Sequence, residues 1–319
     1  MLLSRSSRRL SAAIVIAGSV LFAAPVLTAQ ATSPTKTQAS VAPARHSAVA
    51  QRDGLAIHYA VVGDLASGKT PLLVLHGAYM SADAMGAMVD RFARTRPIIV
   101  LDQRGHGRTG DGKGPITYEA LADDAAAVLD AAGVKQADVF GYSMGGGAAI
   151  QMAIRHPARV AKLVPVSAGT RLDATYKEVL AGIQQITPAV FANTAIKKEY
   201  DRLAPRPQDF PILVEKLKVL DATAFDWGAG MKALQHKTMI VMGDYDVMAP
   251  EHGVEMFRSR GGGAPALAAQ GFLTTPPPAR LLVLPGTSHI GIMAEADAIV
   301  ASVVPFLDDV TPPMAPGFF

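Results

Sequence analysis

The sequence predicts an α/β fold with a mostly parallel central sheet and helices on both of its faces. Short apolar segments alternate with helical segments along most of the chain, and this alternation is typical of a parallel sheet buried on both sides. Glycine-rich or polar residues follow several of the apolar segments. In sheets of this class, ligand sites form at the carboxyl ends of the strands. We therefore expect the functional residues at these segment ends.

Seven segments are predicted to be strands, the first because it alternates with β-type residues and the others because they are short and mostly apolar. In chain order they are 55–62, 71–75, 98–101, 137–142, 160–166, 238–242 and 280–284. Helices are predicted at 118–132, with Gly133 as the C-cap, and at 146–155. The segment 171–237 has no buried strand and is interrupted by prolines, so we expect a helical cap over the strand ends. Residues 261–278 are expected to form an inserted loop over the end of the sheet.

The first 31 residues have the pattern of a secretory signal peptide. Three arginines precede an apolar stretch from Leu10 to Leu27, and Ala29-Gln30-Ala31 forms a small-x-small cleavage site. We expect export to the periplasm or the medium, with an uncleaved membrane anchor as the alternative. The chain is thus divided into a signal peptide (1–31), a flexible linker (32–50), a folded domain (51–310) and a C-terminal tail (311–319).

Composition limits the classes of partner. The chain has 30 basic and 27 acidic residues, and three of the basic ones lie in the signal peptide, so the remainder is balanced at 27 of each. No run of Lys or Arg follows residue 31, so nucleic-acid binding is not expected, nor is membrane contact beyond export. No His/Asp/Glu cluster has metal-ligand spacing and no G-x-G-x-x-G follows a strand, so no metal or cofactor is expected. The sequence leaves the oligomeric state open.

Residues 141–145 read Gly-Tyr-Ser-Met-Gly and lie between a predicted strand and a predicted helix. This is the context of a nucleophile elbow, in which a sharp turn exposes the serine and its neighbours must be small. A serine nucleophile needs a base, and the base needs an acid that orients it. His289 follows the last predicted strand, and both Asp244 and Asp246 follow the strand before it.

Together these motifs resemble those of the α/β-hydrolase superfamily, among its bacterial esterase, haloperoxidase-like and lactonase-like members. The five matching motifs are His76-Gly77, 102–107, 141–145, 243–246 and 286–289. The resemblance implies an α/β-hydrolase fold, with Ser143 as the nucleophile, His289 as the general base and Asp246 as the acid. Asp244 is the competing choice for the acid.

The same resemblance implies an oxyanion hole of two backbone N–H groups. Met144, which follows the nucleophile, supplies one, and Ala78 supplies the other, with Tyr79 as the second choice. The substrate pocket is expected between the strand ends and the cap, near Met80, Met144, Phe225 and Trp227, although the last two are equally plausible as packing residues of the cap.

The resemblance implies a bacterial serine esterase, and the signal-peptide pattern predicts that it is secreted. It would cleave a small-molecule carboxylic ester, or a related acyl bond, through an acyl-enzyme. A serine at the nucleophile position, rather than an aspartate, disfavours haloalkane dehalogenase and epoxide hydrolase chemistry. Two alternatives remain open: a non-catalytic binding protein on the same fold, and a cofactor-free perhydrolase or C–C hydrolase that uses the same triad.

Overall fold

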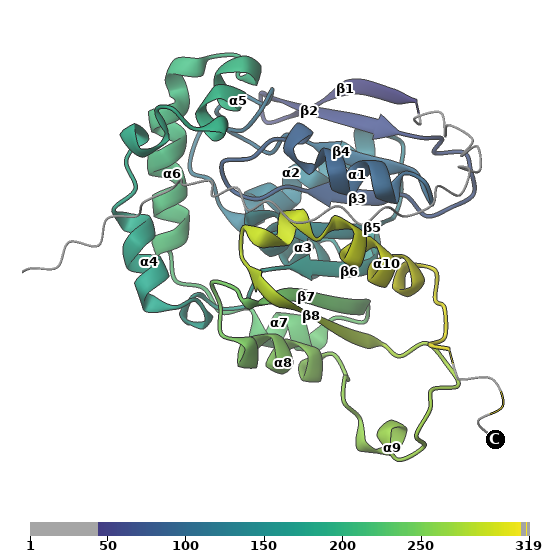
Figure 1. Cartoon of the computed structure of the whole chain (residues 1–319). Helices are drawn as coiled ribbons and strands as arrows, with labels where there is room; N and C mark the ends of the chain where they lie inside the picture. Colours follow the sequence, from purple (N-terminus) through teal and green to yellow (C-terminus); the bar gives the residue numbers. More distant parts are fainter. Residues whose placement is uncertain (1–43, 314–316, 318–319) are drawn as a thin grey trace, which may run out of the picture. The chain divides into compact units, whose positions relative to one another are not determined.

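The computed structural model describes residues 44–313 and residue 317 (Figure 1). The predicted signal peptide and the predicted linker up to residue 43 lie outside these residues. One sheet of eight strands has the order β1-β2-β4-β3-β5-β6-β7-β8. The strands from β3 to β8 run parallel, whereas β2 is antiparallel to both of its neighbours. The predicted α/β class with a mostly parallel sheet is confirmed.

The eight strands are β1 (Arg45–Arg52), β2 (Leu55–Val62), β3 (Leu72–Leu75), β4 (Ile98–Leu101), β5 (Ala137–Tyr142), β6 (Val160–Val166), β7 (Lys237–Tyr245) and β8 (Ala279–Ser288). All of them except β1 lie close to the predicted segments. The inner strands β3, β4 and β5 are buried along their whole length, which explains why continuous apolar runs located them.

Strand β1 was not predicted, because residues up to 50 were assigned to the linker. Most of its residues are exposed at the edge of the sheet, so it lacks a clear apolar pattern. The signal for the strand is the turn that follows it. Asp53 and Gly54 both have positive φ, 50° and 77°, as a two-residue hairpin turn requires, and they join Arg52 to its partner Leu55.

Helices cover both faces of the sheet (Figure 1). On one face, α1 (Gly86–Phe92) and α10 (Ala296–Leu307) pack against the strands. The other face carries α2 (Tyr118–Ala131), α3 (Met144–Arg155), α7 (Gly228–Ala233) and α8 (Pro250–Ser259). Strand β3 shows the division between the two faces. Leu72 and Val74 pack on the face covered by α1 and α10, whereas Leu73 and Leu75 pack on the opposite face. Both faces are therefore buried, as the fold class requires.

Three helices between β6 and β7 lie at the carboxyl ends of the strands (Figure 1). They are α4 (Lys177–Gln184), α5 (Ala195–Leu203) and α6 (Phe210–Ala222), and we call them the cap helices. The prolines used to predict the segment stand mostly in first turns, as Pro211 does in α6, where a missing N–H is tolerated. Helix α7 lies in the predicted cap segment but packs against α3 and α8, which cover the sheet.

The predicted inserted loop lies at the amino end of the sheet. Residues 261–278 contain the short helix α9 (Pro265–Ala268) and lead into the amino end of β8, away from the cap helices (Figure 1). No residue of this loop lines the cavity described below. A loop that precedes a parallel strand must lie at its amino end, which places this one opposite the site.

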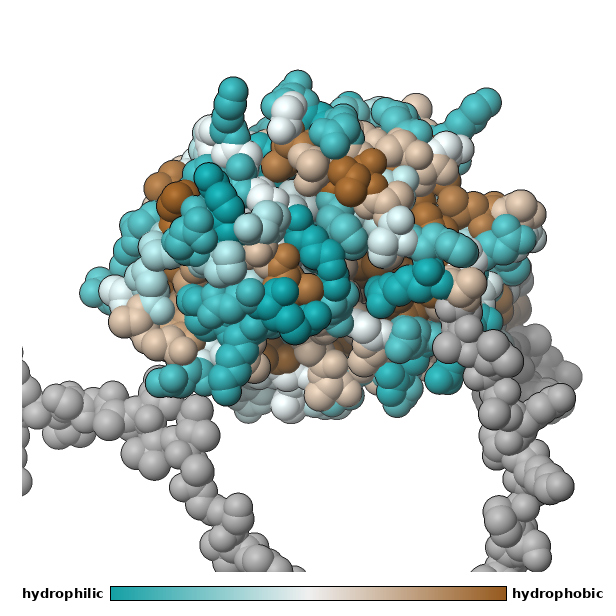
Figure 2. Space-filling model, turned by 90° about the horizontal axis from the view of Figure 1, so that it is seen from above, coloured by the Kyte–Doolittle hydropathy of each residue, from teal (hydrophilic) through white to brown (hydrophobic). Residues whose placement is uncertain are grey.

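The remaining elements are 3₁₀ helices of three or four residues. They are η1 (Asp83–Met85), η2 (Pro157–Arg159), η3 (Leu172–Ala174), η4 (Pro188–Phe191), η5 (Pro207–Asp209) and η6 (Gly291–Ala294). Seen from above, the surface is mixed, with small hydrophobic groups set among hydrophilic side chains (Figure 2). Among the described residues, no helix combines the length and the hydrophobicity needed to cross a bilayer.

Candidate active site

The turn between β5 and α3 holds Ser143 in a strained backbone conformation. Its φ is 55° and its ψ is −120°, a combination that residues other than glycine rarely adopt. A hydrogen bond of 2.8 Å from the Ser143 amide to the Val166 carbonyl holds the turn against β6. A Cβ atom on Gly141 would lie 2.0 Å from the Gly145 oxygen, and one on Gly145 would lie 2.3 Å from the Leu75 oxygen. Both positions therefore exclude any larger residue.

The structure brings Ser143, His289 and Asp246 together in one hydrogen-bonded row. Ser143 Oγ lies 2.9 Å from His289 Nε2, and His289 Nδ1 lies 2.7 Å from Asp246 Oδ1. The competing acid, Asp244, is not part of the row. Its Oδ1 accepts a hydrogen bond of 3.0 Å from the Thr287 amide and so ties the end of β7 to the end of β8.

Asp246 is held by more groups than the sequence indicated. Its side chain has no exposed surface. Its Oδ2 accepts a hydrogen bond of 2.5 Å from Ser167 Oγ, and its Oδ1 accepts one of 2.7 Å from the Val247 amide. Burial acts to raise the pKa of Asp246, but the hydrogen bond and charge of His289, together with these donors, lower it below the usual value. The carboxylate therefore stays ionised and keeps a fixed orientation.

Two residues of this site were missed from the sequence. Ser167 follows β6 directly and has a positive φ of 52°, which aims its hydroxyl at Asp246. Tyr142 Oη donates a hydrogen bond of 2.9 Å to the backbone oxygen of His289 and holds the histidine loop near the elbow. Their position in the sequence could have identified them as site residues, because both stand at the carboxyl ends of parallel strands.

The two backbone N–H groups predicted for the oxyanion hole are free to bind a ligand. Helix α3 begins at Met144, so this residue's amide has no carbonyl of its own helix to bond. Among the described residues, neither the Met144 amide nor the Ala78 amide donates to any group, and both residues line the cavity. The second choice, Tyr79, is occupied, since its amide donates to His106 Nε2 at 3.1 Å.

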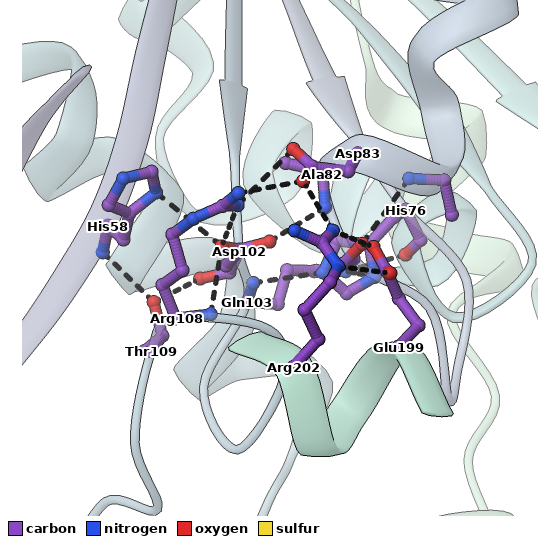
Figure 3. A network of polar contacts seen from close by, with 12 residues as sticks. His58, His76, Ala82, Asp83, Asp102, Gln103, Arg108, Thr109, Glu199 and Arg202 are labelled. Atoms are coloured by element: carbon purple, nitrogen blue, oxygen red, sulfur yellow. Dashed lines mark hydrogen bonds and ion pairs between the residues drawn. The ribbon is translucent and has the colours of Figure 1, made fainter. Parts of the chain in front are cut away.

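A buried polar network positions the loop that carries Ala78 (Figure 3). At its centre, Asp102 accepts hydrogen bonds from the amides of Ala82, at 2.7 Å, and Arg108, at 2.9 Å. His76 Nε2 accepts from the Gln103 amide at 3.0 Å. Burial acts to raise the pKa of Asp102, but His58 and these amides lower it far below its usual value. The charged carboxylate thus fixes the ends of β3 and β4 relative to each other.

The same network continues to a cap helix (Figure 3). Arg108 donates to Asp83 at 2.7 Å, and Asp83 also accepts from Arg202 of α5 at 3.0 Å. Arg202 in turn forms an ion pair of 2.7 Å with Glu199. These contacts join α5 to the loop after β3 and hold one wall of the cavity in place.

A cavity of about 790 Å³ lies above Ser143 and His289. Its walls are mostly apolar and include Val179, Ile183 and Leu220 of the cap helices. Such a cavity has the size and the polarity of a small-molecule site. Across residues 44–313 and 317, no group of three or more His, Asp or Glu side chains is arranged to hold a metal ion.

Three of the four pocket residues predicted from the sequence line the cavity. They are Met80, Met144 and Phe225. Trp227 does not line it and instead stacks on Phe225, with ring centroids 4.1 Å apart. Trp227 also packs edge-on against Tyr118, at a centroid distance of 5.0 Å, and therefore supports the wall from behind.

Several known proteins resemble this chain in sequence or in structure. Residues 70–215 match the alpha/beta hydrolase fold family. RutD of Caulobacter vibrioides, provisionally named a carbamate hydrolase, is 27% identical over 227 residues, which cover 65% of this chain and 83% of RutD. The 2-hydroxymuconate semialdehyde hydrolase of Pseudomonas putida is 29% identical over 204 residues, 56% of this chain and 72% of that protein. The enol-lactonase of Burkholderia xenovorans LB400 superposes with a TM-score of 0.62 at 20% identity, over 82% of this chain and 100% of the lactonase. The family match, the related hydrolases and the eight-stranded sheet with its elbow place this chain in the α/β-hydrolase superfamily.

Proposed function

We propose that this hydrolase cleaves carboxylic esters by a serine mechanism, with Ser143 as the nucleophile, His289 as the general base and Asp246 as the orienting acid. The observation that supports it best is the row of contacts at the cavity floor, 2.9 Å from serine to histidine and 2.7 Å from histidine to aspartate. These distances meet the requirement for a base within hydrogen-bond reach of its nucleophile and of its orienting group.

In this mechanism Ser143 Oγ attacks the substrate carbonyl carbon while His289 Nε2 takes its proton. The carbonyl oxygen becomes an oxyanion, which accepts hydrogen bonds from the amides of Met144 and Ala78. His289 then protonates the leaving alcohol, and an acyl-enzyme remains. A water molecule, activated by the same histidine, releases the acid. Asp246 stabilises the imidazolium that forms in each half of the cycle.

The apolar cavity supports a substrate with a hydrophobic acyl or alcohol portion. The related proteins named above carry names for carbamate, semialdehyde and lactone substrates, and attack on a carbonyl carbon is common to such reactions. A carboxylic ester is the simplest member of this group. Lactones and other acyl bonds belong to the same proposal because the triad and the two free amides serve them in the same way.

A fluorophosphonate probe tests this function directly. It should modify Ser143 covalently, and the mass increase should appear in the tryptic peptide 136–155, in which Ser143 is the only serine or threonine. Hydrolysis of 4-nitrophenyl esters of graded chain length should then identify the preferred acyl group. If the folded protein neither reacts with the probe nor hydrolyses any of these esters, it is a binding protein on this fold and the proposal is wrong.

Two substitutions at Met144 separate the backbone from the side chain in the oxyanion hole. Met144→Ala keeps the N–H and should retain turnover within about tenfold of the native value. Met144→Pro removes the N–H and should lower turnover by about 10²- to 10³-fold, as expected for the loss of one oxyanion donor. Proline is tolerated at the first helical position itself, but it also restricts the backbone of the residue before it, which is Ser143 at φ 55° and ψ −120°. The loss in Met144→Pro should therefore be at least that of one donor, and circular dichroism should show whether the variant keeps its helices. An equal, severe loss in both variants would assign the function to the side chain instead.

We also propose that the protein is exported and that its first 31 residues are removed. The arginines, the apolar stretch and the cleavage site at Ala29-Gln30-Ala31 support this proposal. N-terminal sequencing of the protein secreted by a bacterial host should begin near Thr32. A mature protein that begins at Met1 and stays in the cytosol would contradict it.

A further inference from the structure

Three carboxylates line the cavity, and they differ in their partners. Asp83 and Glu199 both lie against Arg202, at 3.0 Å and 2.7 Å. The third, Asp221, stands near the end of cap helix α6 and forms no hydrogen bond or ion pair with any described residue. Asp221 is therefore the one carboxylate on the described wall whose charge the protein does not neutralise by direct contact.

Asp221 is partly buried, and no described basic side chain contacts it. Burial raises the pKa of Asp221 to about 6, and His289 across the cavity offsets this only in part. Arg171 also lines the cavity, but it is paired with Asp173, at 3.1 Å, and with Glu255, at 3.0 Å. An unpaired carboxylate in an apolar site is destabilising. We therefore expect a ligand to compensate its charge.

Aromatic rings stand around the same part of the cavity. Tyr79, Tyr118 and Phe225 line it, and the charge of Asp221 acts on both tyrosines, raising their pKa beyond the effect of burial. The Tyr79 hydroxyl is buried and has no hydrogen-bond partner. Aromatic faces attract cations, and a carboxylate among such faces makes a site for a positively charged nitrogen.

We propose that Asp221 determines specificity by binding a cationic nitrogen of the substrate, so that the preferred substrates are esters that carry an ammonium group. This inference rests on the proposed ester hydrolysis. The cation would lie between Asp221 and the aromatic wall while the ester carbonyl lies at Ser143. Its charge compensates the buried carboxylate, and its desolvation is offset by the rings.

Matched pairs of esters test the proposal, because each pair differs only in charge. On the alcohol side the pair is butyrylcholine and 3,3-dimethylbutyl butyrate. On the acyl side it is the 4-nitrophenyl esters of 4-(trimethylammonio)butyrate and of 5,5-dimethylhexanoate. We expect kcat/KM to favour the cationic member of at least one pair by about tenfold or more, the order expected for a charge-assisted contact.

Three variants show whether Asp221 is responsible for this preference, measured as the ratio of kcat/KM for the cationic ester to kcat/KM for the neutral one. Asp221→Asn keeps the shape and removes the charge, so the ratio should fall to about one. Asp221→Glu keeps the charge and should retain a preference for the cation. Glu199→Gln is the matched control, since it neutralises a cavity carboxylate that already has Arg202 as its partner, and it should leave the ratio near its native value.

Three results would overturn the inference while leaving ester hydrolysis intact. The first is a native ratio near one on both pairs. The second is a cation preference that survives in Asp221→Asn. The third is a loss in Asp221→Asn that is equal for charged and neutral esters, which would mean that the carboxylate acts on His289 and not on the substrate. A native protein that hydrolyses the unbranched 4-nitrophenyl esters but none of these four would also overturn the inference. Failure on the four esters, on the unbranched esters and on the fluorophosphonate probe together would instead refute the proposed function on which the inference rests.

Discussion

Ser143→Ala should lower turnover of a carboxylic ester by about 10⁶-fold, equivalent to roughly 8 kcal/mol of transition-state stabilisation. The hydroxyl is the atom that forms the acyl-enzyme, and its 2.9 Å contact with His289 Nε2 is lost with it. No other described hydroxyl contacts this nitrogen. The residual rate should come from the oxyanion hole and from substrate binding alone.

The measurement is the turnover number of the purified variant, with the fluorophosphonate label as a second readout. Alanine keeps the backbone of the elbow, so the melting temperature should change little. Ser302→Ala is the matched control, because Ser302 lies on α10, outside the cavity, and its hydroxyl bonds only to the Ala298 carbonyl. That variant should be fully active. Turnover of Ser143→Ala within tenfold of native would remove Ser143 from the mechanism.

Elements whose side chains are buried on both faces could be predicted from the sequence. Strand β4 was predicted residue by residue, because Ile98–Leu101 is a fully apolar run between Pro97 and Asp102. The elbow was predictable for a different reason. A backbone conformation that admits only small neighbours leaves glycines at fixed offsets, and Gly141 and Gly145 are those glycines.

Features that depend on contacts distant in sequence could not be predicted in the same way. The hydrogen bond from Ser167 to Asp246 spans 79 positions, and no local pattern distinguishes Ser167 from other serines after strands. Asp221 is a second example, because its local sequence predicts a different environment from the one it has. A carboxylate near the end of an amphipathic helix is typical of a solvated face, and only the position of α6 over the strand ends turns it toward the cavity.

Asp246→Asn should lower turnover by about 10⁴-fold, roughly 5 kcal/mol of transition-state stabilisation, while KM changes much less. The carboxylate holds His289 Nδ1 at 2.7 Å. It thereby selects the tautomer whose Nε2 accepts the serine proton, and it stabilises the imidazolium that follows. An amide of the same shape cannot carry that charge. It also presents an N–H₂ group to a site that the Ser167 hydroxyl and the Val247 amide already fill with donors.

Asp244→Asn is the matched control for this prediction, because it makes the same chemical change two residues away. Asp244 bonds the Thr287 amide and not His289, and an asparagine oxygen can still accept that bond, so its turnover should stay within about tenfold of native. Asp246→Asn should also change how the stability of the protein depends on pH. The pKa of Asp246 is lowered in the folded protein, so its contribution to stability is present above the unfolded pKa and disappears as the pH falls through the folded one. The melting temperature of Asp246→Asn should therefore lie below the native value at pH 7, and the two should converge in acid. If Asp244→Asn is instead the variant that loses four orders of magnitude, the orienting acid is Asp244.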